Sequence, residues 1–125
     1  MMTFGFLALV LLPLSQPIVR ERSGEALWRA HCAACHGMDG KGGGPAAKAL
    51  KKTPPDLTVL SKRNQGKFPT NIVERTILGD PRLDVHGTRE MPIWGPAFSE
   101  LEGDRDLSRM RVRNLSEFLK NLQER

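Results

Sequence analysis

Two cysteines and a histidine stand close together in the segment Cys32-Ala33-Ala34-Cys35-His36, and the chain contains no other cysteine. Two thiols at this spacing can each add across one vinyl group of a haem, and the next residue places an imidazole beneath the iron. The order Cys-x-x-Cys-His therefore has the local chemistry of covalent haem attachment. We predict that Cys32 and Cys35 hold one haem and that His36 is a ligand of its iron.

Three other uses of the cysteine pair compete with haem attachment. A structural zinc site needs four nitrogen or sulfur ligands, and no second cysteine pair or His-x(3–5)-His follows, so a distant residue such as His86 would have to complete the set. A redox dithiol lies between a strand and a helix, but no strand rich in Val and Ile precedes Cys32. A disulfide between these cysteines would close a very short loop and add little stability. The residues favour haem attachment over all three.

Three motifs together resemble those of a class I c-type cytochrome, over roughly Gly24 to Leu122. They are the Cys-Ala-Ala-Cys-His segment, a glycine-rich loop that runs into Pro45, and the later pair Met91-Pro92. The resemblance implies an all-α, small cytochrome c fold, with three to five helices around one covalently attached haem c. It also implies that the first and last helices pack against each other through Gly24, Trp28, Leu115 and either Phe118 or Leu119.

The same resemblance assigns roles to residues around the haem. It implies that Met91 is the second axial ligand, on the face of the haem opposite His36. It further implies that a backbone carbonyl of Gly44-Pro45 accepts a hydrogen bond from the other ring nitrogen of His36, which would orient the imidazole. A methionine thioether raises the reduction potential of the iron relative to a second imidazole.

Some neighbouring side chains leave alternatives open. His86, five residues before Met91, is the rival axial ligand, and ligation by two histidines would lower the potential. We expect the indole N–H of Trp94 to bond a haem propionate, because a buried indole N–H needs a partner. The other polar candidates for the propionates are Arg63, Asn64 and Arg89.

Length and composition fit one modest domain that contains a large cofactor. The chain has 125 residues, of which 6% are aromatic and 39% hydrophobic, so a core made of side chains alone would be thin. A haem would fill part of that core.

The net charge of +5 is unevenly placed. Seven basic residues stand against one acid between Lys41 and Lys67, whereas eight acids stand against four bases between Phe68 and Ser108. A basic stretch can simply be a solvated surface, or it can steer an acidic redox partner toward the haem edge. It contains no interleaved aromatic residues and no nucleic-acid motif, so we expect no binding to nucleic acid.

The first 19 residues carry no charged side chain and include the apolar run from Phe4 to Leu14. This run has the length of a signal-peptide core rather than of a membrane span. No Lys or Arg precedes it, and Pro13 to Pro17 makes a poor cleavage site, so a retained membrane anchor stays open. We expect residues 1–19 to be a signal peptide or anchor and residues 20–125 to be the cytochrome c domain. The expected location is periplasmic or otherwise exported, with membrane anchoring as the alternative.

Helical periodicity and helix-breaking residues predict the elements that carry these motifs. No segment alternates as a strand does. The expected helices are Glu25–His31, which delivers Cys32, Ala46–Lys52, Asn71–Leu78 with Thr70 as its cap, and a last helix from Asp106 or Ser108 to Gln123. A long loop is expected from Asp80 to Ser99, and a loop of that length in a small domain is usually functional.

These observations predict a monohaem carrier that transfers single electrons between redox partners. Two filled axial positions leave the iron no site for a substrate, so we expect no enzymatic activity of the chain itself. The main alternative is a haem-bearing subunit or anchored module of a larger oxidoreductase complex. A five-coordinate haem enzyme or gas-binding protein is less favoured, because it requires that Met91 does not bind the iron. The expected partners are redox proteins that are acidic or membrane-bound.

Overall fold

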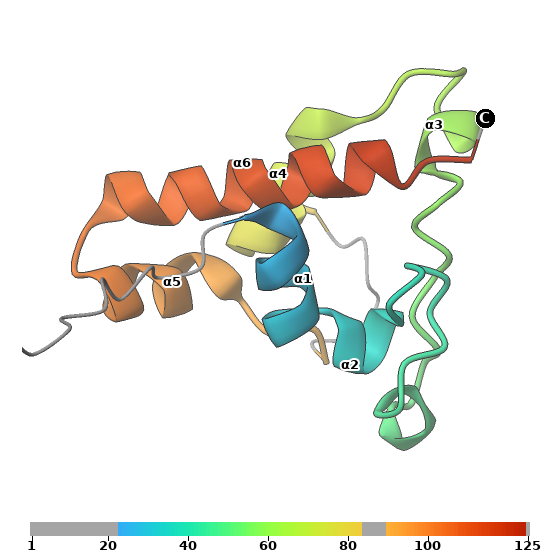
Figure 1. Cartoon of the computed structure of the whole chain (residues 1–125), viewed down its shortest axis with the longest axis horizontal. Helices are drawn as coiled ribbons and strands as arrows, with labels where there is room; N and C mark the ends of the chain where they lie inside the picture. Colours follow the sequence, from blue (N-terminus) through green and yellow to red (C-terminus); the bar gives the residue numbers. More distant parts are fainter. Residues whose placement is uncertain (1–22, 84–89, 125) are drawn as a thin grey trace, which may run out of the picture.

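The computed structural model describes residues 23–83 and 90–124, and all regular structure within these residues is helical. The elements are α1 (Gly24–His31), α2 (Ala33–His36), the 3-10 helix η1 (Ala47–Ala49), α3 (Leu60–Arg63), α4 (Thr70–Leu78), α5 (Trp94–Glu102) and α6 (Arg105–Asn121). Figure 1 shows α6 along the longest axis of the molecule. α1 packs against α6 at a steep angle, and the chain between α2 and α3 extends along one side. The prediction of an all-α fold is confirmed.

The first helix follows the local signals in its sequence. The hydroxyl of Ser23 accepts a hydrogen bond from the backbone N–H of Ala26 at 3.2 Å and so caps the N-terminus. Glu25 and Arg29, one turn apart, form an ion pair of 2.9 Å on the exposed side. The helical path is interrupted at Cys32, where φ is −116°, and α2 begins at the next residue. The helix predicted to deliver Cys32 is therefore present.

α1 and α6 approach each other closely. A Cβ atom at Gly24 would overlap the backbone oxygen of Asn114 and lie 2.7 Å from the Cβ of Phe118, so this position requires glycine. The Trp28 and Phe118 rings lie 5.8 Å apart, and Leu115 is only 1% exposed. The predicted contact between the first and last helices is confirmed.

The core forms where α1, α4 and α5 pack on α6. Its buried apolar residues are Leu27, Trp28, Ala33, Val73, Ile77, Phe98, Val112, Leu115 and Leu119. Burial of a side chain of Val, Leu, Ile or Phe contributes about 1.5–3 kcal/mol to stability. The same cluster contains residues from α1, α2 and α5, so it fixes the relative positions of the elements that carry the haem-attachment motif and Trp94.

The helix predicted over residues 46–52 is wrong in extent, because only the single turn η1 forms. Leu50 is already extended, with a ψ of 144°. The backbone N–H groups of Lys51 and Lys52 then donate to the carboxylate of Glu90, at 2.9 and 3.4 Å, instead of continuing a helix. A long-range hydrogen bond thus overrides the local helical tendency.

The loop predicted from Asp80 to Ser99 is also wrong in extent, because α5 begins at Trp94. Pro96 is the third residue of this helix, where a backbone N–H has no partner within the helix. A proline in the first turn therefore removes no helical hydrogen bond, although in the sequence it indicates a break.

Other boundaries differ by a few residues. α4 includes Thr70 as its first residue, with Pro69 in the cap position, and α6 begins after Asp104, whose side chain accepts from the N–H of Asp106 at 2.7 Å. The single turn α3 was not expected. The predictions for residues 1–19, His86 and Arg89 lie outside the described residues. In the described part of the chain, none of the helices combines the length and apolar character needed to span a bilayer.

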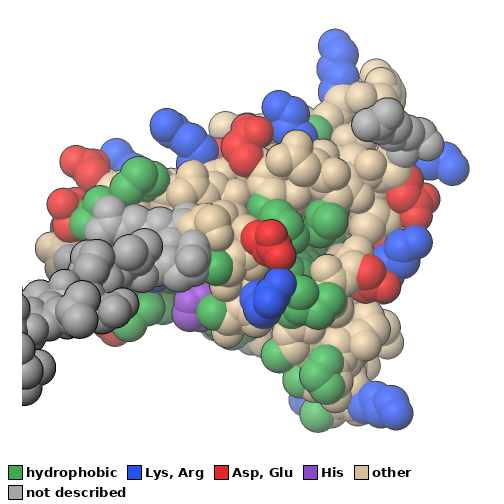
Figure 2. Space-filling view, viewed as in Figure 1, with side chains coloured by type: hydrophobic (Ala, Val, Ile, Leu, Met, Phe, Trp, Pro, Cys, Tyr) green, Lys and Arg blue, Asp and Glu red, His purple; other side chains and the backbone are tan. Residues whose placement is uncertain are grey.

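Charged side chains of both signs lie around the outline of the face drawn in Figure 2, and hydrophobic side chains gather near its middle, where an acidic and a basic side chain also lie. The seven basic side chains between Lys41 and Lys67 are all exposed. One of them, Lys41, pairs with Glu124 at 2.9 Å. The basic stretch is therefore a surface, and part of its charge is compensated by neighbouring acids.

Candidate functional site

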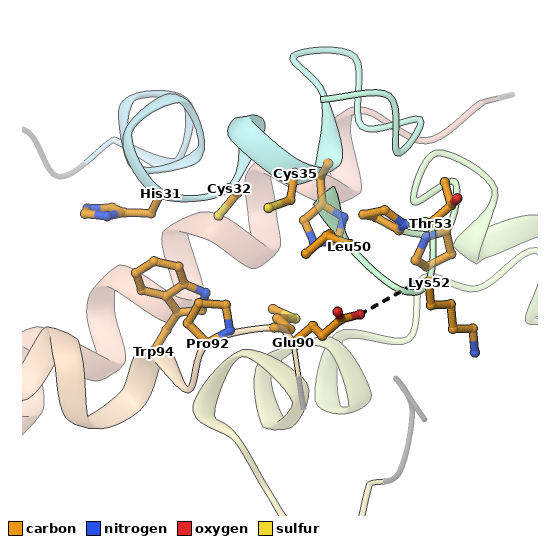
Figure 3. Close-up of a pocket in the computed structure, with 13 residues that line it drawn as sticks. His31, Cys32, Cys35, Leu50, Lys52, Thr53, Glu90, Pro92 and Trp94 are labelled. Carbon is orange, nitrogen blue, oxygen red and sulfur yellow. Dashed lines mark hydrogen bonds between the residues drawn. The ribbon is translucent and has the colours of Figure 1, made fainter. Parts of the chain in front are cut away.

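A pocket of about 280 Å³ lies between the cysteine motif and the segment around Met91. Its lining residues are His31, Cys32, Cys35, His36, Leu50, Lys52, Thr53, Pro54, Pro55, Glu90, Met91, Pro92 and Trp94. Figure 3 shows His31, Cys32 and Cys35 on one wall, with Glu90, Pro92 and Trp94 on the wall opposite. Five of the six residues predicted to bind the cofactor, all except Pro45, thus line one cavity.

The motif is held in place by α1 and by a single helical turn. In α2 the N–H of His36 donates to the oxygen of Cys32 at 2.9 Å, which brings both cysteines and the histidine to one turn of chain. The indole Nε1 of Trp28 donates to the oxygen of Gly37 at 3.1 Å. The Trp28 and His36 rings lie 5.8 Å apart, and His36 is only 8% exposed. Burial and ring packing therefore restrict the orientation of this imidazole.

The glycine-rich loop folds back over α2. Gly44 donates to the oxygen of Cys35 at 3.2 Å, and Ala46 donates to the oxygen of Ala34 at 2.8 Å. A Cβ atom at Gly44 would overlap the backbone oxygen of Ala34, so the close approach depends on glycine. Pro45 lies between these two bonds, is exposed and does not line the pocket. Its predicted role beside the His36 ring stays a prediction.

The two thiols are half-buried and are not joined to each other. Burial, followed by the proximity of Cys35, raises the pKa of Cys32 to about 12. A raised pKa is the opposite of the depressed pKa that activates the attacking thiol of a redox dithiol. Across residues 23–83 and 90–124, no group of three or more His, Cys, Asp or Glu residues is placed to hold a metal ion.

On the opposite wall, Met91 is half-buried and packs against the hydrophobic core. Trp94 begins α5, and its ring stacks on Phe98 at 5.6 Å and lies 5.2 Å from the His31 ring. The remaining polar candidates are less well placed. Arg63 and Asn64 are exposed and do not line the pocket, and the Asn64 side chain donates to the oxygen of Lys67 at 2.7 Å.

An aromatic and cationic group adjoins the pocket at the end of α1. The centres of the His31 and Phe98 rings lie 5.4 Å apart. The Arg111 guanidinium lies 5.6 Å from the centre of the same Phe98 ring. Burial, and then the positive charge of Arg111, lower the pKa of His31. Arg111 could not be predicted from the sequence, because nothing in the pattern of α6 distinguishes a buried arginine from an exposed one.

One side of the pocket, formed by residues 50–55 and Glu90, was not predicted from the sequence either. The pair Pro54-Pro55 was a usable signal, since proline fixes φ and the residue before it avoids the helical region, which favours an extended segment. Glu90 gave no signal, because its hydrogen bonds reach residues 39 and 38 positions earlier in the chain.

The residues present fit a covalently held haem. The free thiols of Cys32 and Cys35 and the buried imidazole of His36 lie on one wall of the pocket. The thioether of Met91 lies in the segment that forms another wall. An apolar pocket with soft sulfur and imidazole ligands suits haem iron.

Comparison with known proteins agrees with this geometry. The cytochrome c family model matches residues 22–123. The chain matches no curated protein and no solved structure. Because the family match covers nearly the whole chain and includes the haem-attachment motif, this protein belongs to the cytochrome c family, as a class I c-type cytochrome that binds haem c covalently and carries electrons.

Proposed function

We propose that the haem is six-coordinate, with His36 and Met91 as axial ligands, and that the chain transfers single electrons between redox partners. The observation that carries this proposal is the pocket that has Cys32, Cys35 and His36 in its lining together with Met91. The bound haem supplies a one-electron iron couple. Two occupied axial positions leave no coordination site for a substrate.

Each residue of the site has a distinct task in this proposal. Cys32 and Cys35 hold the haem by thioether bonds, and burial against Trp28 orients His36. Met91 supplies a soft ligand that raises the potential. Trp94, fixed at the start of α5 by its stacking on Phe98, offers its indole N–H to a propionate.

Location and partners belong to the same proposal. The apolar, uncharged segment of residues 1–19 supports export, with haem attachment outside the cytoplasmic membrane. The exposed basic residues between Lys41 and Lys67 support an acidic or membrane-bound redox partner. The mass of the purified holoprotein tests the first point, because a cleaved leader removes the apolar run.

Replacement of the two rival ligands tests the axial ligation. In Met91→Ala we expect loss of the weak sulfur-to-iron charge-transfer absorption of the oxidised protein, binding of carbon monoxide by the reduced protein, and a lower reduction potential. Met110→Ala, a change at a half-exposed methionine of α6, is the matched control and should leave all three unchanged.

His86→Ala separates the proposal from its rival. If His86→Ala produces the three effects and Met91→Ala does not, the iron has two histidine ligands. Carbon monoxide binding by the unaltered reduced protein would instead indicate a five-coordinate haem.

A further inference from the structure

The carboxylate of Glu90 joins two segments at the edge of the pocket. It accepts hydrogen bonds from the backbone N–H groups of Lys51 at 2.9 Å and Lys52 at 3.4 Å, one on each carboxylate oxygen. Figure 3 draws the bond to Lys52 and shows Glu90 reaching from its own wall to the neighbouring segment. Met91 is the next residue in the chain.

A second attachment follows Met91 on its other side. A Cβ atom at Gly79 would overlap the side chain of Ile93, so Ile93 packs directly on the end of α4. Trp94 then begins α5 and stacks on Phe98, which is fully buried. Met91 and Pro92 therefore form a short run between the Glu90 hydrogen bonds and two packing contacts, that of Ile93 with Gly79 and that of Trp94 with Phe98.

The two attachments differ in strength and in location. Ile93 contacts Gly79 at the end of α4 and Trp94 stacks on the buried Phe98, whereas Glu90 is held by hydrogen bonds to the backbone of two exposed lysines. Hydrogen bonds that involve a charged group are stronger than neutral ones. Here they are exposed, so water competes with them.

We propose that Glu90 is a positioning residue that holds Met91 against the haem by tying its segment to Lys51 and Lys52. The proposal rests on the axial role of Met91 given above. The two hydrogen bonds to Glu90 oppose displacement of the Met91 thioether from the iron by an external ligand. Loss of the tie should therefore favour local opening of the Met91 segment, with a smaller effect on global unfolding, because neither lysine belongs to the buried core.

Imidazole binding to the oxidised holoprotein tests this role at one fixed pH. The variants are Glu90→Ala, which removes both bonds, and Glu90→Gln, which keeps one acceptor oxygen and replaces the other with a donor NH2 group. Glu100→Ala, at an exposed position of α5, is the matched control for loss of a carboxylate. Loss of the sulfur-to-iron absorption reports displacement of Met91, and denaturant unfolding of each holoprotein reports global stability.

We expect Glu90→Ala to bind imidazole about tenfold more tightly than the unaltered protein, which corresponds to about 1.4 kcal/mol. Glu90→Gln should lie between the two, and Glu100→Ala should match the unaltered protein. Unchanged imidazole affinity in Glu90→Ala overturns the proposal, and so does an affinity change no larger than the change in global stability. If the unaltered protein lacks the sulfur-to-iron absorption, Met91 ligation itself fails and the role of Glu90 falls with it.

Discussion

The indole Nε1 of Trp28 and the backbone oxygen of Gly37 are joined by a buried hydrogen bond of 3.1 Å. Gly37 directly follows the haem-attachment motif, so this bond ties the core of α1 to the end of α2. The same indole lies 5.8 Å from both the His36 and the Phe118 rings. One side chain therefore connects the packing of α1 on α6 with the orientation of the His36 imidazole.

Replacement of this indole should destabilise the protein. Trp28→Phe keeps an aromatic ring but removes the indole donor, so the Gly37 oxygen keeps only the bond from the Gly40 N–H at 3.2 Å. Loss of one such hydrogen bond costs about 0.5–1.5 kcal/mol. We expect denaturant unfolding of the holoprotein to show a decrease of this size in the free energy of unfolding. A variant as stable as the unaltered protein would show that water or a shifted backbone group satisfies that oxygen.

Covalent attachment should depend on both cysteines. Acid–acetone extraction of the unaltered holoprotein should leave the pigment on the polypeptide, because thioether bonds survive this treatment. Cys32→Ala and Cys35→Ala should each weaken retention, and the double variant should release all haem and show little helix by circular dichroism, since the core then lacks its largest component. Complete extraction from the unaltered protein would contradict the attachment.

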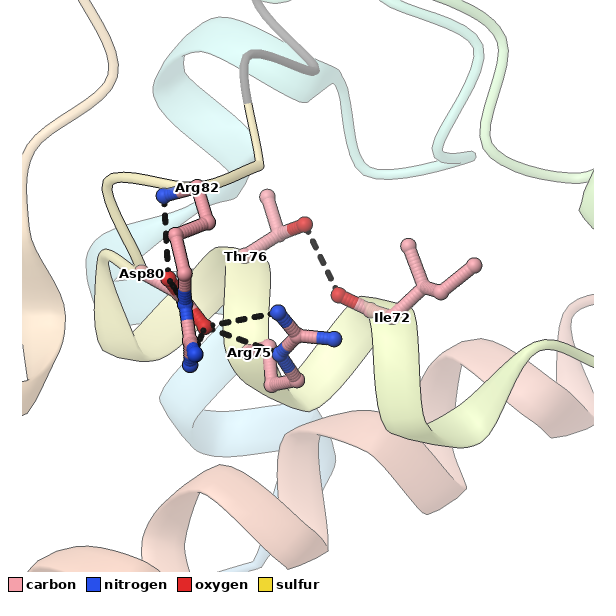
Figure 4. A network of polar contacts seen from close by, with 5 residues as sticks. All are labelled: Ile72, Arg75, Thr76, Asp80 and Arg82. Atoms are coloured by element: carbon pink, nitrogen blue, oxygen red, sulfur yellow. Dashed lines mark hydrogen bonds and ion pairs between the residues drawn. The ribbon is translucent and has the colours of Figure 1, made fainter.

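The ion-pair network at the end of α4 predicts a pH dependence of stability. Figure 4 shows Asp80 between Arg75 and Arg82, with bonds of 2.9 Å from Arg75 Nε and 3.0 Å from Arg82 Nε. Hydrogen bonds from Arg82, first, and from Arg75 hold the pKa of Asp80 far below its ordinary value. A depressed folded-state pKa adds stability above the unfolded-state pKa of about 3.9, and this stability is lost as the pH falls toward the folded-state value.

Asp80→Asn should therefore be less stable than the unaltered protein at neutral pH, by an amount that is constant down to about pH 5. Below about pH 4 the difference should shrink as the carboxylate of the unfolded chain becomes protonated. Denaturant midpoints across this pH range measure the difference. The exposed Glu25→Gln, which breaks the surface pair with Arg29, is the control and should show little effect at any pH. A difference that vanishes already at pH 6 would contradict the assignment.

The exposed basic stretch should accelerate encounter with an acidic partner. Charge reversal at Lys48, Lys62 and Lys67, three exposed residues of this stretch that do not line the pocket, should slow electron transfer to an acidic acceptor at low salt while the reduction potential stays nearly unchanged. Added salt should remove the difference, because the Debye length is about 10 Å at 0.1 M. Lys120→Glu on α6 is the control for a single charge elsewhere. Rates that do not respond to salt in any variant would leave the basic stretch with a role in solubility alone.

The features that can be predicted from the sequence are those determined by residues close together in the chain. The Ser23 cap, the periodic apolar face of α6 and the spacing of Cys32 and Cys35 each act within a few residues, so the helices and the attachment wall follow from them. The conformation of the segment after η1 depends instead on hydrogen bonds to Glu90, 39 residues after Lys51. The helical propensity of that segment does not indicate this contact. Pro96 was misleading because the same residue ends a helix in its interior but is tolerated in its first turn.

The packing of Gly24 on Asn114 also affects the order of events during folding. These residues are far apart in the chain, so α1 has no helix to pack on until α6 docks. Contacts between residues so distant in sequence form late, because closing a large loop costs conformational entropy. We therefore expect both thiols to be accessible in the unfolded chain, and the docking of α6 to close the fold around the motif afterwards.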